Sequence, residues 1–247
     1  MKYFGLGDSI SSDDYPDVEI GLRHNGAANI FGNYLWASQQ VSSYKSLAVD
    51  GATIQDIVRY QLPRMRKYVN ERMIITLTAG GNNISFGLIK YFDTNKKLME
   101  FEQFDPFIEN IKKDYDTLVN TILHTFPKAI LILNNLYDPT DITNELPPNH
   151  GSWNNIAPLY SLGRRMLGIH IKSNAIFQHY VRDVLFADIY KTFVLKGAAT
   201  NYEYGYYYKK FVIEPGAVGA VVIAKLWIEA FENHIQKEEE KKNDHGN

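Results

Sequence analysis

"KYFGLGDSIS", residues Lys2–Ser11, is the stretch of the sequence that decides the fold. A short apolar run ends at Gly7 and is followed at once by Asp8 and Ser9. Short apolar runs bounded by such residues are typical of buried parallel strands. Ser9 is therefore either a nucleophile at the end of a strand or a hydroxyl in a tight turn, because Gly-Asp-Ser is also good turn chemistry. This stretch alone does not decide between the two.

The pattern of this first strand recurs along the chain, with longer amphipathic segments between the recurrences. Five short strands are predicted, at Tyr3–Leu6, Tyr44–Val49, Met73–Ala79, Ala129–Asn135 and Leu185–Ile189. Apolar residues at three- and four-residue spacing predict helices over Phe107–Ile122 and Leu159–Tyr180, and a last apolar helix is predicted from about Gly216 to Ile235. This alternation indicates a three-layer α/β domain with a parallel sheet, whose ligand crevice lies outside the carboxyl ends of the strands.

Composition excludes several classes of function. The chain has 247 residues, a net charge of -2 and no cysteine, which excludes disulfides and thiolate sites and gives no basic footprint for nucleic acid. No apolar run is long enough for a membrane span, and the N-terminus lacks a secretory signal pattern, so we expect a cytoplasmic protein or a mature secreted form. No feature indicates an oligomeric state. Residues 1–236 are expected to form one domain, and the charged segment 237–247 a disordered tail.

The residues just after the strands carry the candidate chemistry. A dinucleotide site is disfavoured because Ile10 stands at the third glycine position of G-x-G-x-x-G, and Ser11 breaks the G-x-S-x-G nucleophile elbow. What remains is a serine with separate hydrogen-bond donors. Ser9 follows the first strand, Gly51 the second and Asn82 the third. A hydroxyl with three converging N–H donors is what a serine acylation site requires.

Three segments around these residues resemble a known superfamily. "GLGDSIS", "VDGAT" and "TAGGNN" are similar, in order and spacing, to blocks I, II and III of the SGNH (GDSL-type) hydrolases, and the resemblance runs to about Trp227. It implies a flavodoxin-like α/β/α sandwich with a five-stranded parallel sheet. It also implies that Ser9 is the nucleophile and that Gly51 and Asn82 are oxyanion donors. The activity implied is hydrolysis of a small ester or acylated molecule, with no metal or organic cofactor. Asn83 stands where the family usually has Asp.

The last block of the family departs from this pattern. In "FVIEPGAVGAVVIAKLW", Pro215 and Gly219 match the landmarks, so the catalytic His position falls on Glu214 and its Asp partner on Phe211. Three explanations are open. Glu214 serves as the base, with a pKa raised by burial; or a loop histidine, His24 or His150, replaces it. In the third explanation the site is inactive, and the chain is an SGNH scaffold in which Glu214 recognises a glycan or another polar ligand.

Other polar residues near the strand ends have two interpretations each. Asp8 is expected to cap the Ser9 turn, and Asp13 and Asp14 to cap a turn before Pro16, although each could face the crevice. Asp188 ends the fifth strand and could hydrogen-bond into the site. The tyrosines of "NYEYGYYYKK" (201–210) favour loop packing over stacking on a ligand.

Overall fold

A computed structural model describes residues 1–140, 146, 152–179, 183–194, 205–208, 210 and 213–244. It contains one sheet of five parallel strands in the order β2-β1-β3-β4-β5. The strands are β1 (Lys2–Leu6), β2 (Ser43–Ser46), β3 (Met73–Leu77), β4 (Ala129–Asn134) and β5 (Val184–Ala187). All five predicted strands are confirmed, and each ends earlier than predicted except β1, because the residues after it turn out of the sheet into the loops of the crevice.

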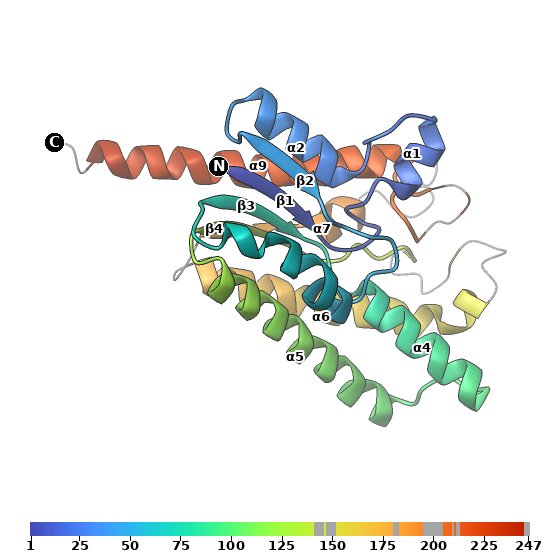
Figure 1. Ribbon diagram of the computed structural model, residues 1–247. Helices are drawn as coiled ribbons and strands as arrows, with labels where there is room; N and C mark the ends of the chain where they lie inside the picture. Colours follow the sequence, from blue (N-terminus) through green and yellow to red (C-terminus); the bar gives the residue numbers. More distant parts are fainter. Residues whose placement is uncertain are drawn as a thin grey trace.

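Helices cover both faces of this sheet (Figure 1). On one face lie α1 (Asp14–Ile20), α2 (Ala27–Ala37) and α9 (Ala217–Asp244). On the other lie α4 (Gly81–Asn95), α5 (Phe101–Thr125) and α6 (Ser152–His179). Shorter turns complete the chain: α3 (Ile54–Asp56), η1 (Ile57–Gln61) and η2 (Leu62–Tyr68) precede β3, and α7 (Ile189–Val194) follows β5. The predicted three-layer α/β/α sandwich is confirmed.

The core explains why these segments adopt these forms. Every residue of β3 and β4 is buried, as expected for central strands covered by helices on both faces. In α5 the predicted stripe is confirmed, because Ile111, Tyr115, Leu118 and Ile122 are buried while Phe107 packs at its edge.

The apolar stripe expected on α6 began with Leu159, Leu162, Met166 and Ile169, and only part of it faces the core. Leu159, Leu162 and Met166 pack against the core but are only partly buried, and Ile169 is 68% exposed. The fully buried face runs through residues at three- and four-residue spacing: Ile156, Tyr160, Arg164, Leu167, Ile171 and Ala175. A charged residue inside this row concealed it, because an arginine interrupts an apolar pattern.

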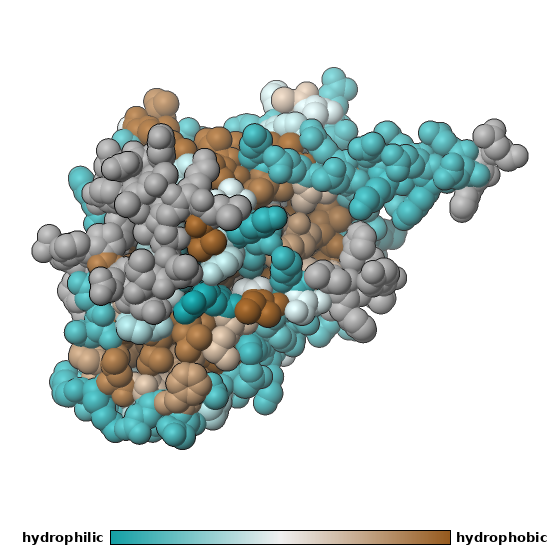
Figure 2. All heavy atoms as spheres, turned by 180° about the vertical axis from the view of Figure 1, so that it is seen from behind, coloured by the Kyte–Doolittle hydropathy of each residue, from teal (hydrophilic) through white to brown (hydrophobic). Residues whose placement is uncertain are grey.

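The end of the chain also differs from the prediction. The segment from Lys237 continues α9 as far as Asp244 rather than losing regular structure, and residues 245–247 lie outside the described part. Glu and Lys are good helix formers, and Lys241 pairs with Glu238 at 3.4 Å within one turn. Figure 2 shows this projecting end of α9 covered by hydrophilic side chains. No helix in the described residues is long and apolar enough to cross a membrane.

The strand order places the crevice between two neighbouring strands. The chain runs from β1 outward to β2, and then returns to β3 on the other side of β1. Loops leaving the carboxyl ends of β1 and β3 therefore diverge, which is where open α/β sheets bind ligands. Ser9 follows β1 and Asn82 follows β3, so both candidates lie at this point.

Candidate active site

The turn after β1 presents Ser9 at the edge of the sheet. Gly7 has a φ of 139°, and a Cβ there would lie 2.0 Å from Thr78 Oγ1, so only glycine fits. Gln61 holds this glycine from both sides: the Gly7 N–H donates to Gln61 Oε1 at 2.8 Å, and Gln61 Nε2 donates to the Gly7 carbonyl at 2.7 Å. Ser9, which is 4% exposed, is therefore fixed by the backbone before it.

Asp8 caps this turn, as expected. Its Oδ1 accepts the Ile10 N–H at 3.2 Å, and its carbonyl accepts the N–H groups of Ser11 and Ser12. The side chain is buried, and desolvation raises its pKa, which a hydrogen bond with Thr78 partly offsets. Asp8 is thus a structural acid that also lines the pocket of Ser9.

The second and third strand ends are tied together through two asparagines. Asn82, in the first turn of α4, donates from Nδ2 to the Ala52 carbonyl at 3.1 Å. Asn83 accepts the Ile54 N–H at 2.9 Å and donates to Gln55 Oε1 at 2.8 Å. The turn that contains Gly51 is therefore fastened to the start of α4.

The three candidate donors lie differently around the pocket. Ser9 and Asn82 both line it, whereas Gly51 lies beside it, at the turn that Asn82 contacts. Gly51 has a φ of 72°, a left-handed conformation that favours glycine. Within the described part of the chain, the N–H groups of Ser9 and Gly51 form no hydrogen bond.

The segment before α9 brings Glu214 into the same pocket. Tyr207 and Pro215 form an isolated antiparallel bridge, and the Tyr208 N–H donates to the Glu214 carbonyl at 2.9 Å. From the sheet side, the Tyr137 hydroxyl donates to the Ile213 carbonyl at 2.7 Å. Glu214 is only 6% exposed and lines the pocket with Ser9 and Asn82.

Burial dominates the electrostatics of Glu214. Desolvation raises the pKa of its carboxyl to about 8, and the negative charges of Asp8 and Asp50 act in the same direction. The Ser9 side chain and the charge of Arg164 act in the opposite direction and lower this pKa. Oε2 is buried without a partner among the described residues. The folded protein therefore holds the proton of this carboxyl to a higher pH than an exposed glutamate would.

One member of the pocket was missed in the sequence. Arg164 of α6 is 3% exposed and lines the pocket with Ser9 and Glu214. Its Nε donates to the Tyr137 carbonyl at 2.7 Å and its Nη1 to the Tyr160 hydroxyl at 2.6 Å. The signal that could have found it is the row of buried positions in α6 that an arginine interrupts.

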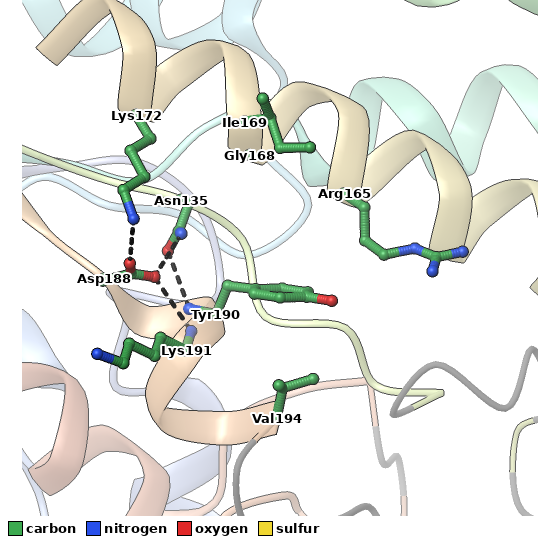
Figure 3. Close-up of a pocket in the computed structure, with 9 residues that line it drawn as sticks. All are labelled: Asn135, Arg165, Gly168, Ile169, Lys172, Asp188, Tyr190, Lys191 and Val194. Atoms are coloured by element: carbon green, nitrogen blue, oxygen red, sulfur yellow. Dashed lines mark hydrogen bonds and ion pairs between the residues drawn. The ribbon is translucent and has the colours of Figure 1, made fainter. Parts of the chain in front are cut away.

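Asp188 belongs to a neighbouring hollow instead. Its carboxylate accepts from Asn135 Nδ2 at 2.7 Å and the Lys191 N–H at 3.1 Å, and pairs with Lys172 at 2.9 Å. Figure 3 shows these contacts on the floor of a hollow of about 320 Å³ between α6 and α7. Asp188 thus holds the strand end in place and does not line the pocket of Ser9.

Among the described histidines, none lines the pocket of Ser9. His24 is 72% exposed and pairs with Asp13 at 3.4 Å. Asp13 also accepts the Gly26 N–H at 2.7 Å, so it fastens the loop before α2. His150 and Phe211 lie outside the described residues.

The tyrosines of the described part favour the packing interpretation. Tyr206 and Tyr207 are buried, and their rings contact Phe193. Tyr202 and Tyr204 lie outside the described residues.

The described part of the chain contains no group of three or more side chains that could hold a metal ion.

Comparisons with known proteins agree on the fold. No protein-family model and no curated protein matches the chain. Among solved structures, the lipase Lip_vut3 from a goat rumen metagenome superimposes with a TM-score of 0.65 at 17% identity, over 93% of this chain and 97% of that one. The acetylxylan esterase Axe2 from Geobacillus stearothermophilus gives 0.63 at 14% identity over 93% of both chains. Phospholipase A1 from Streptomyces albidoflavus NA297 gives 0.62 at 15% identity, over 93% and 98%.

These likenesses define the class of fold. A five-stranded parallel sheet between helical layers, shared with lipases and acetylxylan esterases over nearly their whole length, is the SGNH hydrolase fold. At such identities the likeness concerns the fold, and the chemistry has to be argued from the pocket itself.

Proposed function

We propose that this protein hydrolyses carboxylic esters through an acyl-enzyme formed on Ser9. The observation that carries the proposal is the meeting of Ser9, Asn82 and the buried carboxyl of Glu214 in one pocket at the strand-order reversal. Nucleophile, base and oxyanion donor are the parts that acyl transfer requires. The lipases and esterases of the same fold support this class of reaction.

In the first step, the ionised Glu214 carboxylate takes the proton of Ser9 as Oγ attacks the carbonyl carbon. The carbonyl π electrons move to its oxygen, which the N–H groups of Ser9 and Gly51 and the amide of Asn82 stabilise. Glu214 then returns the proton to the leaving alcohol as the ester C–O bond breaks. Water repeats the sequence on the acyl-enzyme and releases the acid.

A carboxylate base is compatible with the loss of the orienting Asp. Imidazole needs a partner to fix its tautomer, whereas a carboxylate does not. The pKa of about 8 for Glu214 meets the other requirement, because a base is most effective when its pKa lies near the working pH.

The pocket favours a short acyl group. Tyr137, Tyr160 and Ile213 also line it, and the pocket has little free space. We therefore expect acetyl esters to be better substrates than esters of long fatty acids.

The test uses p-nitrophenyl acetate and a fluorophosphonate probe. Wild-type protein should hydrolyse the ester and gain one mass adduct on Ser9, and Ser9→Ala should lose both while keeping its circular dichroism and melting temperature. Ser12→Ala, a buried serine three residues away, is the matched control and should keep both. Equal background turnover by wild-type and Ser9→Ala would refute the proposal.

A non-catalytic scaffold that binds a glycan or another polar ligand is the second candidate. The observation that favours it is the raised pKa of Glu214, because a protonated carboxyl donates a hydrogen bond to a ligand instead of accepting a proton. No adduct on Ser9, together with saturable binding of a xylo-oligosaccharide by calorimetry, would select this function.

A further inference from the structure

The guanidinium of Arg164 is a buried cation with an unused donor. Nε and Nη1 are hydrogen-bonded to Tyr137 and Tyr160, but Nη2 is buried without a partner among the described residues. No ion pair within 4.0 Å in the described part of the chain involves Arg164. The faces of the two tyrosine rings, at 4.8 and 5.2 Å, hold the group in place. Asp8 and Asp138 interact with this charge at longer range. A buried charge without a direct ion-pair partner is costly, so the position requires a function.

The guanidinium lies at the start of α4. A Cβ added to Gly81, the first residue of this helix, would meet Arg164 Nη1 at 2.9 Å and Asp8 Oδ2 at 4.0 Å. The N-terminus of a helix carries a partial positive charge and favours anions. A cation placed against it creates a region of positive potential that an anion would relieve.

The proposed chemistry has such an anion. Imidazole becomes a cation when it takes the serine proton, and this cation faces the developing oxyanion. A carboxylate becomes neutral instead, so the negative charge moves from Glu214 to the substrate oxygen and meets no new positive charge. A centre with a carboxylate base therefore needs a fixed cation from elsewhere in the protein.

We propose that Arg164 is this cation: it balances the negative charge of the centre, first on the Glu214 carboxylate and then on the oxyanion of the tetrahedral intermediate. The inference rests on the proposed ester hydrolysis and adds a positioning residue to it. Arg164 forms no bond to the reacting atoms; it acts through the charge that it holds beside them.

Arg164→Met tests this role, and Arg165→Met is the matched control. Arg165 is the next residue of α6, and its guanidinium lies at the neighbouring hollow (Figure 3). With p-nitrophenyl acetate, Arg164→Met should lower kcat about a hundredfold with little change in KM, because the lost interaction is made in the transition state. Arg165→Met should stay within about threefold of wild type.

The pH profile separates this role from a structural one. Arg164→Met should move the midpoint of the kcat profile to higher pH, because the charge that favours ionised Glu214 is gone. Arg164→Lys keeps the charge and should keep the midpoint, even though it loses the hydrogen bonds to the tyrosines. Neither variant changes the other ionisable groups that interact with Glu214, which are Asp8, Asp50, Tyr15, Tyr137 and Tyr160.

Two outcomes overturn the inference. One is an active wild type in which Arg164→Met behaves as Arg165→Met does, in both kcat and midpoint. The other is an equal midpoint shift in Arg164→Lys and Arg164→Met, which would mean that packing and not charge matters. If Arg164→Met does not fold, the comparison of Arg164→Lys with wild type still decides: its midpoint has to stay in place.

The inference also has a readout that does not depend on turnover. The Glu214 carboxyl carbon can be titrated by NMR in protein labelled with ¹³C-glutamate. A wild type without esterase activity would refute the proposed function alone. In that case a higher Glu214 pKa in Arg164→Met than in Arg165→Met supports Arg164 as the charge partner of Glu214, and equal values refute it.

Discussion

The two sides of the pocket are built in different ways. On the side of the proposed oxyanion donors, called here the donor side, the turns after β1 and β2 carry Ser9 and Gly51, and the first turn of α4 carries Asn82. Hydrogen bonds of neighbouring residues fasten these turns. On the base side, Glu214 stands between a tyrosine hydroxyl bonded to the residue before it and a two-residue bridge. The pKa of its carboxyl is set by its burial and by the charged groups around it.

This difference shows which parts of the sequence determine each side of the pocket. Donor geometry depends on local backbone conformation, so it can be read from a few adjacent residues such as Gly-Asp-Ser. The pKa of Glu214 depends on burial and on charges in the loops after β1 and β2 and in α6, which lie far away in the sequence. The two sides can therefore be broken separately by mutation.

The largest expected effect comes from removing the base. Glu214→Gln keeps the size of the side chain but has no carboxylate to take the Ser9 proton, so kcat should fall by about 10² to 10⁴. Steady-state kinetics with p-nitrophenyl acetate measures this fall. Glu19→Gln is the control: Glu19 accepts the Ala217 N–H at 2.6 Å, next to the same segment, and its variant should keep activity. Full activity of Glu214→Gln would exclude Glu214 as the base.

On the donor side, the adjacent asparagines form a matched pair. Asn82→Ala should lower kcat by about 10² to 10³ with KM nearly unchanged, which is the usual cost of one oxyanion donor. Asn83→Ala should mainly cost stability, on the order of 1 kcal/mol, because its two hydrogen bonds hold the turn of α3. Kinetics and denaturant unfolding of both variants measure the two effects. A reversed order of the two kcat losses would contradict the donor assignment.

The pH dependence tests the base side without any mutation. Since burial raises the pKa of Glu214 to about 8 and only the ionised form takes a proton, activity should rise with pH through a midpoint near 8 and level off about one pH unit higher. At two pH units below this midpoint, kcat should be about a hundredfold lower. A profile that is flat between pH 6 and 9 would show that another group acts as base.

Stability should depend on pH with the opposite sign. Because the folded protein holds the Glu214 proton up to about pH 8 while the unfolded chain releases it near 4.5, folding binds a proton between these values. The free energy of unfolding should therefore fall as pH rises from about 4.5 to 8, and this slope should be smaller in Glu214→Gln, where the buried Asp8, whose pKa is also raised, still contributes. Urea unfolding at several pH values measures both slopes.

The same difference explains what could be predicted from the sequence. The strands and the α5 stripe followed from apolar periodicity, and Ser9, Gly51 and Asn82 from their places after strands. The helices α2 and α4 were not predicted, and Gly32 and Gly87 interrupt their patterns. The helical spacing in α6 could have placed Arg164 on the buried face, but its contacts with Tyr137 and Tyr160 form only in the folded chain.

The smallest expected effect concerns the support of the donor side. Gln61→Leu keeps the volume of the side chain but leaves the buried N–H of Gly7 without a partner and its carbonyl with the Val49 N–H alone, so the free energy of unfolding should fall by about 1 to 3 kcal/mol. Urea unfolding measures the loss. Gln236→Leu, on the exposed face of α9, should change it by less than about 0.5 kcal/mol. A Gln61→Leu protein as stable as wild type would show that the hydrogen bonds of Asp8 are enough to stabilise the Ser9 turn.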